Sequence, residues 1–132
     1  MSLNDHTFRA VIFDMDGVLI DSEPLWKIAM LDVFSSLGST LTAEDFQRTV
    51  GLRIDQVVEY WNHEDQWGID DIHSVVNQII DRMVVLISEN PYPLPGVIDT
   101  LDYLSKTDIK IGLATSSPQR LIDAVLKYLN IG

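Results

Sequence analysis

The sequence contains no cysteine among its 132 residues. Disulfide bonds and thiolate metal sites are therefore excluded, and the absence of both is compatible with a reducing cytoplasm. No apolar run approaches the roughly 18 residues that a membrane-spanning helix requires. The first ten residues, MSLNDHTFRA, also lack the basic flank and the apolar core of a signal peptide. We expect a soluble, cytoplasmic protein.

Basic residues are scarce as well. Nine lysines and arginines stand against 20 aspartates and glutamates, which gives a formal net charge of −11. Nucleic acids and anionic membranes bind basic surfaces, so neither is expected as a partner. A small anionic substrate would have to be held by local donors or by a metal ion. The hydrophobic fraction of 46% is ample for a core, and the length fits one domain or a small domain with an insertion.

Two short segments predict buried parallel strands. Residues 8–13 (FRAVIF) and 109–114 (IKIGLA) are rich in apolar and β-branched residues, and polar segments flank both. Elsewhere the apolar spacing is helical, and residues 90–96 (NPYPLPG) interrupt it as a linker. The predicted helices span residues 24–37, a short segment beginning at 42–45, and residues 54–61, 69–88, 97–105 and 118–129.

The order of these segments predicts an α/β fold with an insertion. A parallel pair of strands needs only one crossover helix, so the helical excursion over residues 19–90 is best explained as a cap subdomain inserted after the first strand. Residues 1–18 and 91–132 would then form part of a Rossmann-like core with a parallel sheet.

Polar clusters follow both predicted strands, at the edge where ligands bind in open α/β sheets. Asp14 and Asp16 follow the first strand. Residues two apart in extended chain point the same way, so both carboxylates could face one site and hold a hard dication such as Mg²⁺. One aspartate could then attack phosphorus while the other transfers protons. Thr115 and Ser116 follow the second strand at a predicted helix N-terminus, where hydroxyl and backbone N–H donors suit an anion.

These residues resemble the first two motifs of the haloacid dehalogenase-like (HAD) superfamily. A hydrophobic strand precedes Asp14-Met-Asp-Gly17, and a second strand ends in Thr115. The stretches DMDGVLIDSEPLW, GLRIDQVVEYW, PLPGV and GLATSSP are similar to the branch of sugar phosphatases and beta-phosphoglucomutase. The resemblance implies that Asp14 is the nucleophile, which forms an aspartyl-phosphate. It also implies that Asp16 is the general acid/base, that both aspartates contribute oxygen to Mg²⁺, and that Thr115 with the Ser116 N–H holds the phosphoryl group.

The resemblance further implies a Mg²⁺-dependent phosphatase that acts on a small phosphorylated metabolite of the hexose or hexitol phosphate class. Family members that displace halide from carbon lack an acid two residues after the nucleophile, so Asp16 favours phosphoryl transfer. A phosphomutase and a non-catalytic binding module stay open as alternatives. We expect a monomer.

The family pattern also contains features that this sequence does not show. It adds a lysine after a third strand and a pair of acids after a fourth, and none of Lys27, Lys106, Lys110 and Lys127 fits that lysine motif. Two strands are also few for such a sheet. We therefore expect the sequence to be the N-terminal part of a longer enzyme, with little activity alone.

Two residues of the predicted cap are further candidates for binding substrate. Arg53 follows Gly51 and Leu52 in a predicted loop and could hold the substrate phosphate, although a surface ion pair explains it equally well. Glu23 could reach the substrate from the point where the cap begins. Ser22, just before it, is predicted to cap the following helix.

Overall fold

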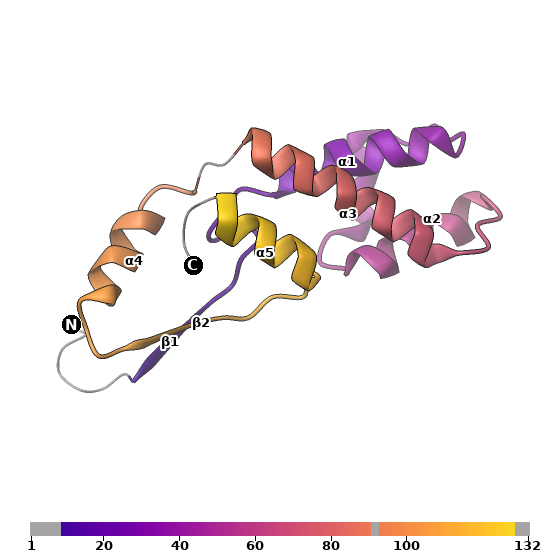
Figure 1. Ribbon diagram of the computed structural model, residues 1–132. Coiled ribbons are helices and arrows are strands. Elements are labelled where there is room, and N and C mark those ends of the chain that lie inside the picture. The colour runs from indigo at the N-terminus through magenta and orange to yellow at the C-terminus, as the bar shows by residue number, and fades with distance from the viewer. Residues whose placement is uncertain (1–8, 91–92, 129–132) are drawn as a thin grey trace. The chain divides into compact units, whose positions relative to one another are not determined.

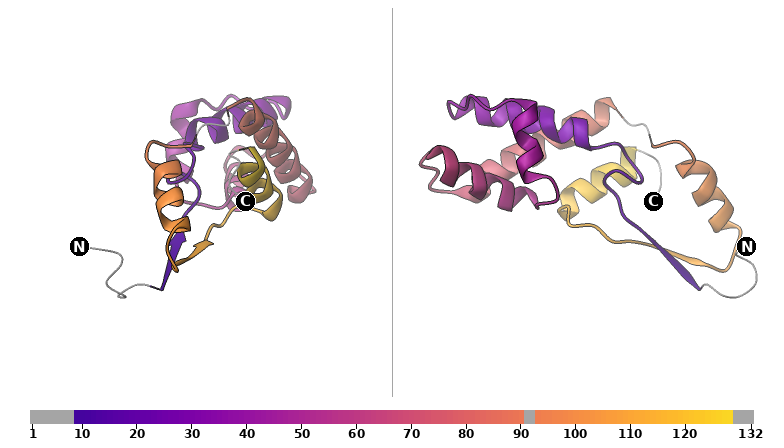
Figure 2. Two further views of the ribbon diagram at one scale, coloured as in Figure 1. Left: turned by 60° about the vertical axis from the view of Figure 1, so that its left-hand side comes forward. Right: turned by 180° about the vertical axis from the view of Figure 1, so that it is seen from behind.

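The computed structural model describes residues 9–90 and 93–128 (Figures 1 and 2). The chain divides into two compact units, one from the described parts of residues 1–22 and 92–115 and the other from those of residues 23–91 and 116–132. Among the described helices, none is long and apolar enough to span a membrane.

The first unit is built on a pair of parallel strands. Strand β1 (Ala10–Phe13) pairs with β2 (Lys110–Leu113), in a register that sets Ala10 opposite Lys110 and Phe13 opposite Leu113. The ladder continues beyond the strands, because the Ala114 N–H donates to the Phe13 carbonyl at 2.8 Å. Helix α4 (Val97–Ser105) precedes β2 along the chain. The pairing confirms the predicted parallel arrangement.

A tight loop follows β1 and returns the chain on itself. The carbonyl oxygen of the buried Met15 accepts hydrogen bonds from the backbone N–H groups of Val18, Leu19 and Ile20. Gly17 adopts a φ of 76°, and its N–H donates to the Ile20 carbonyl at 2.8 Å. Such a left-handed conformation favours glycine, which lacks a Cβ atom. The sequence DMDG thus forms a closed turn directly after the strand.

The two connections that leave the first unit run antiparallel beside each other. Ile20 forms an antiparallel bridge with Pro93, and the Leu94 N–H donates to the Leu19 carbonyl at 3.0 Å. Both Leu19 and Ile20 are buried. The chain therefore enters and leaves the helical excursion at one place in this unit.

The second unit is helical. It contains α1 (Glu23–Ser36), the 3₁₀ helix η1 (Ala43–Thr49), α2 (Ile54–Asp65), α3 (Ile72–Glu89) and α5 (Gln119–Tyr128). The central helix is α3, which contacts α1, α2 and α5 (Figure 1). Its apolar residues recur every three or four positions, so they lie along the buried side of the helix. Those buried residues are Val75, Val76, Ile79, Ile80, Met83, Leu86 and Ile87.

Helix α5 belongs to this second unit, through its contacts with α3. The sequence-based interpretation assigns residues 91–132 to the core, so the structure groups this helix differently. How the complete protein divides into core and cap stays a prediction.

Candidate active site

Asp14 lies immediately beyond the end of β1. Its neighbour Phe13 is paired with Leu113, and the Phe13 carbonyl also accepts the Ala114 N–H. The Asp14 side chain is exposed, and its Oδ1 accepts a hydrogen bond from the Met15 backbone N–H at 2.7 Å. The following peptide therefore orients a solvent-accessible carboxylate at the end of the strand.

Asp16 lies two residues further along, inside the closed turn. Its side chain is half-buried, and its Oδ1 accepts a hydrogen bond from the hydroxyl of Ser22 at 2.6 Å. The Ser22 residue is only 2% exposed. Hydrogen bonds from a hydroxyl to a carboxylate are short and strong at this distance. The turn thus places a buried donor against the predicted general acid/base.

Thr115 lies at the same end of the strand pair as Asp14. In a parallel ladder the carboxyl ends of both strands coincide, and the hydrogen bond from Ala114 to Phe13 keeps the chains aligned up to the residue before Thr115. Thr115 is half-buried and belongs to the first unit. The structure therefore brings three of the predicted site residues, Asp14, Asp16 and Thr115, to one end of one unit.

Ser116 is exposed and falls in the second unit, ahead of α5. Helix α5 begins at Gln119, and the Pro118 carbonyl accepts its first hydrogen bonds, from Leu121 and Ile122. The N-terminus of the helix thus lies slightly later in the chain than the sequence pattern predicts.

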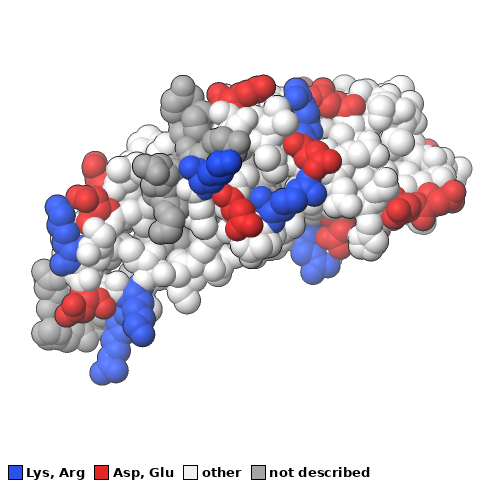
Figure 3. Space-filling model, viewed as in Figure 1, with Lys and Arg blue, Asp and Glu red and all other residues white. Residues whose placement is uncertain are grey.

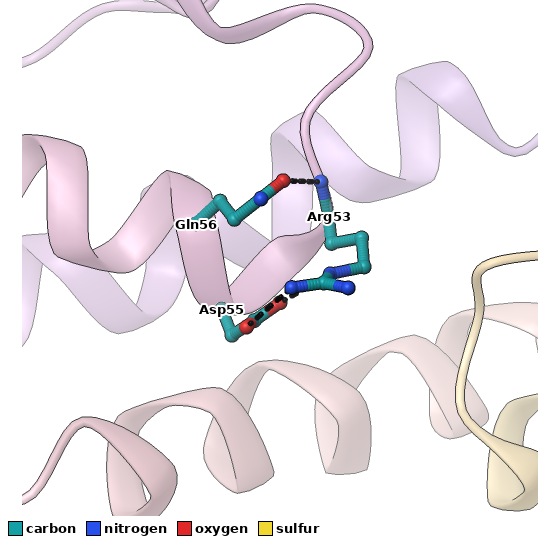
Figure 4. Close-up of polar contacts among 3 residues, drawn as sticks. All are labelled: Arg53, Asp55 and Gln56. Carbon is teal, nitrogen blue, oxygen red and sulfur yellow. Dashed lines mark hydrogen bonds and ion pairs between the residues drawn. The ribbon is translucent and has the colours of Figure 1, made fainter.

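Arg53 takes part in a surface ion pair (Figure 4). Its Nε and Nη2 atoms lie 3.3 and 3.4 Å from the two carboxylate oxygens of Asp55, and its side chain is 56% exposed. The Arg53 backbone N–H donates to the side chain of Gln56, which anchors the start of α2. This arrangement is the surface ion pair that was the alternative explanation for Arg53 in the sequence. A role for Arg53 in binding substrate stays a prediction.

Glu23 is the first residue of α1 and is exposed. Its carboxylate lies 3.4 Å from the Lys27 Nζ, one helical turn further on. Its role in substrate binding likewise stays a prediction.

Acidic and basic side chains are interspersed on the face of the molecule in Figure 3. Ion pairs between described residues join arginines and lysines to acids, for example Arg82 to Asp32 at 2.9 Å and Lys106 to Asp102 at 3.2 Å. Such pairs neutralise positive charge locally.

The donors at the strand end suit a hard cation in kind but are few in number. Asp14 and Asp16 supply oxygen, the ligand atom that Mg²⁺ prefers, whereas Mg²⁺ takes six ligands in an octahedron. Within residues 9–90 and 93–128, no cluster of three or more histidine, aspartate or glutamate side chains could hold a metal ion. The two aspartates therefore fit Mg²⁺ as part of a larger ligand set that includes waters and substrate phosphate.

Residues 11–132 match the family model for the haloacid dehalogenase-like hydrolases. The chain belongs to this family. It is 40% identical over 123 residues to hexitol phosphatase B of Escherichia coli K12, covering 92% of this chain and 55% of that protein. It is 35% identical to the phosphorylated carbohydrates phosphatase of Thermotoga maritima, covering 85% of this chain and 51% of the relative. This HAD-like chain thus spans about half the length of the curated relatives it matches.

Solved structures of similar fold include a beta-phosphoglucomutase candidate from Thermotoga maritima, with a TM-score of 0.69 and 31% identity over 94% of this chain and 57% of the other. A variant of CbbY from Rhodobacter sphaeroides, crystallised with xylulose 1,5-bisphosphate, gives a TM-score of 0.77 at 18% identity. That match covers 92% of this chain and 56% of CbbY, and at this identity it shows the fold alone. The α/β class, with an incomplete parallel-sheet HAD core and a helical cap, is confirmed.

The sequence pattern missed one feature of this HAD-like site, the contact between Ser22 and Asp16. Ser22 immediately precedes α1 and matches the pattern of a helix cap, yet its hydroxyl donates to Asp16. The available signal was Gly17, which permits the closed turn that brings residue 22 back to residue 16.

Proposed function

We propose that the complete protein is a Mg²⁺-dependent phosphatase that hydrolyses a small sugar phosphate of the hexose or hexitol class through an aspartyl-phosphate. The observation that carries the proposal is the parallel register, which sets Asp14 and Thr115 at the same end of the strand pair. The names of two relatives, hexitol phosphatase B and phosphorylated carbohydrates phosphatase, support the substrate class.

Each of the site residues would have a separate role in such a reaction. A carboxylate oxygen of Asp14 attacks phosphorus, and the bond between phosphorus and the sugar oxygen breaks. Asp16 gives its proton to the departing sugar oxygen and later removes a proton from the water that hydrolyses the aspartyl-phosphate. Thr115 and the Ser116 N–H hold the phosphoryl oxygens. When bound, Mg²⁺ neutralises the charge of the phosphoryl group.

Two residues of the helical unit are proposed to select the substrate. Arg53 would exchange its solvent-exposed ion pair with Asp55 for an anionic or hydroxyl group of the sugar phosphate. Because an exposed ion pair contributes only about 0–1 kcal/mol, this exchange costs little. Glu23 would accept a hydrogen bond from a sugar hydroxyl.

The test is a panel of sugar phosphates incubated with the complete protein and Mg²⁺, with free phosphate and isomerised sugar phosphate both measured. In the Asp14→Asn variant the nucleophile is lost while the side chain keeps its size, so turnover should fall by roughly 10³-fold or more. Asp65→Asn is the matched control, because Asp65 is an exposed residue at the end of α2. It should retain wild-type turnover.

Persistent hydrolysis in Asp14→Asn would remove this residue from the nucleophilic role. A phosphomutase is the second candidate, favoured by the beta-phosphoglucomutase candidate among the similar structures. It would convert one sugar phosphate into its isomer and release little free phosphate. A folded complete protein that does neither would point to a non-catalytic binding module.

A further inference from the structure

We propose that Arg48 is a positioning residue for the loop that leads to Arg53. The proposal rests on the proposed function, because it requires Arg53 to bind the substrate. Its basis is a set of contacts by which the Arg48 guanidinium, near the end of η1, is held against side chains of α2. These contacts span the loop between the two helices.

The backbone of this loop forms a defined turn. The loop follows Thr49, the last residue of η1, and the Leu52 N–H donates to the Thr49 carbonyl at 3.2 Å. Val50 has a φ of −58° and a ψ of 134°, and Gly51 has a φ of 89°. These values are typical of a type II turn, which requires a residue such as glycine where φ is positive. The turn ends directly before Arg53.

Each end of the loop is also fixed within its own helix. Thr49 is only 4% exposed, and its hydroxyl donates to the Phe46 carbonyl at 3.2 Å. At the other end, the Arg53 backbone N–H donates to the Gln56 side chain at 3.1 Å (Figure 4). Both contacts lie at one end of the loop only, so neither of them fixes η1 against α2.

Arg48 supplies contacts that do join the two helices. Its Nη2 donates to the Tyr60 hydroxyl oxygen at 2.6 Å, and its Cζ lies 5.4 Å from the centre of the Tyr60 ring and 5.1 Å from that of Trp61. A cation over an aromatic face is attracted by the electrons of the ring. Because Trp61 is only 1% exposed, Arg48 is held by a ring that belongs to the core of the helical unit.

A loop held in this way has a consequence for binding. When a ligand binds only one conformation of a loop, its apparent dissociation constant rises as the fraction of protein in that conformation falls. A loop that is already ordered also loses less conformational freedom when the ligand binds. Arg48 would therefore raise the affinity for the sugar phosphate by acting through Arg53, without touching the substrate.

The competing explanation is that Arg48 only stabilises the helical unit. Its side chain is 55% exposed and also lies 3.9 Å from a carboxylate oxygen of Glu64, as in many surface ion pairs. A contact that only stabilises the fold changes the free energy of unfolding but leaves the KM of the folded enzyme unchanged. The two explanations therefore predict different kinetic results.

The experiment compares Arg48→Ala, Arg48→Lys and wild type in the complete protein. We expect Arg48→Ala to raise KM for the sugar phosphate about threefold, as it would if the competent loop conformation fell to about a third of the population, with kcat within about twofold of wild type. Arg48→Lys keeps a cation beside the two rings and should recover most of the affinity. Arg82→Ala is the matched control, because Arg82 is an exposed arginine whose ion pair with Asp32 joins α3 to α1. It should leave KM unchanged.

A double substitution tests whether Arg48 acts through Arg53. Arg48→Ala should raise KM no further in a protein that already carries Arg53→Ala, because the residue to be positioned is then absent. A full additional threefold increase in the double variant would show that the two residues act independently and would overturn the proposal.

A second readout requires no substrate. The Leu52 N–H, which donates to the Thr49 carbonyl, should exchange with solvent several times faster in Arg48→Ala than in wild type. Exchange should return toward the wild-type rate in Arg48→Lys and should be unchanged in Arg82→Ala. An unchanged rate in Arg48→Ala would show that Arg48 does not order the loop and would overturn the proposal.

The outcomes separate this proposal from the one beneath it. A raised KM in Arg53→Ala with an unchanged KM in Arg48→Ala, or with Arg48→Lys as impaired as Arg48→Ala, would overturn the positioning role alone. An active enzyme whose KM is unchanged in Arg53→Ala would overturn the roles of both arginines. A wild-type protein that hydrolyses no sugar phosphate would overturn the proposed function together with these roles.

Discussion

Gly17 is the residue on which the closed turn after β1 depends. Its φ of 76° is costly for any residue with a Cβ atom, although a Cβ placed there would meet no atom within 4 Å. The cost of Gly17→Ala is therefore conformational, about 1–2 kcal/mol. We expect the substitution to lower the free energy of unfolding by this amount, measured by urea denaturation, and to lower kcat by displacing Asp16.

Gly112→Ala is the control for this prediction, because Gly112 lies in β2 without a positive φ and its added Cβ would lie 3.7 Å from an Ile12 side-chain carbon, an ordinary contact. It should leave the free energy of unfolding and kcat close to wild type. Equal effects of the two substitutions would show that the left-handed conformation of Gly17 is not the cause of the loss.

Substitution of Arg53 tests whether this residue, which forms an exposed ion pair, also binds the substrate. Its contact with Asp55 contributes at most about 1 kcal/mol, because the pair is largely solvated. Arg53→Ala should therefore change stability little, yet it should raise KM for the sugar phosphate about tenfold by removing a charge-assisted hydrogen bond. Steady-state kinetics and thermal unfolding measure the two effects.

The matched variant is Arg82→Ala, which breaks a similar exposed pair with Asp32 and has no proposed part in binding. It should leave KM unchanged. If both variants raise KM equally, the effect is one of general charge and Arg53 has no specific role.

At the scale of elements, α3 is the helix on which the second unit depends. Met83 on this helix is fully buried, whereas Val85, two residues further on, is 42% exposed. Met83→Ala should destabilise the protein by about 2–5 kcal/mol, because it removes apolar contacts and leaves a cavity. Val85→Ala should cost less than about 1 kcal/mol. Similar losses in urea denaturation would show that α3 is not packed as the structure has it.

The sequence predicts these elements well because their apolar spacing is local. The strands and helices fall within a few residues of the predicted ranges, and the differences arise at polar ends. Helix α3 begins at Ile72 and not at residue 69, because the Asp71 side chain accepts the Ser74 N–H and caps it there. Helix α2 continues to Asp65, beyond the predicted end at residue 61, because its last helical turn is polar and apolar spacing does not predict it. Gln66, in a left-handed conformation, ends the helix.

In the candidate site, too, some features follow from the local sequence pattern and others depend on how the folded chain brings side chains together. The position of Asp14 and Thr115 at one strand end follows from parallel pairing, which the pattern of two apolar strands predicts. The contact of Ser22 with Asp16 depends instead on a turn closed by backbone hydrogen bonds, and the partner of Arg53 depends on side-chain geometry. Neither leaves a periodic signal in the sequence.

At the scale of the whole molecule, the strand pair is notable for its exposed apolar side chains. Ile12 in β1 is 68% exposed and Ile111 in β2 is 43% exposed. Parallel sheets are normally covered on both faces, so their strands are apolar on both sides. Because this chain covers only 55% and 51% of two curated relatives that it matches, we expect further polypeptide to cover these side chains in the complete protein.

The last prediction concerns the activity of the 132-residue chain by itself. Its described residues offer Mg²⁺ only part of a ligand set, and an incomplete set weakens both metal affinity and charge stabilisation. With equal amounts of folded protein, confirmed by circular dichroism, the chain should hydrolyse sugar phosphates at least about 100-fold more slowly than the complete protein. Raising Mg²⁺ to millimolar concentrations should recover little of the difference, because the missing contribution is not metal occupancy alone. Comparable rates at equal Mg²⁺ would contradict the prediction and would place the whole catalytic apparatus within these residues.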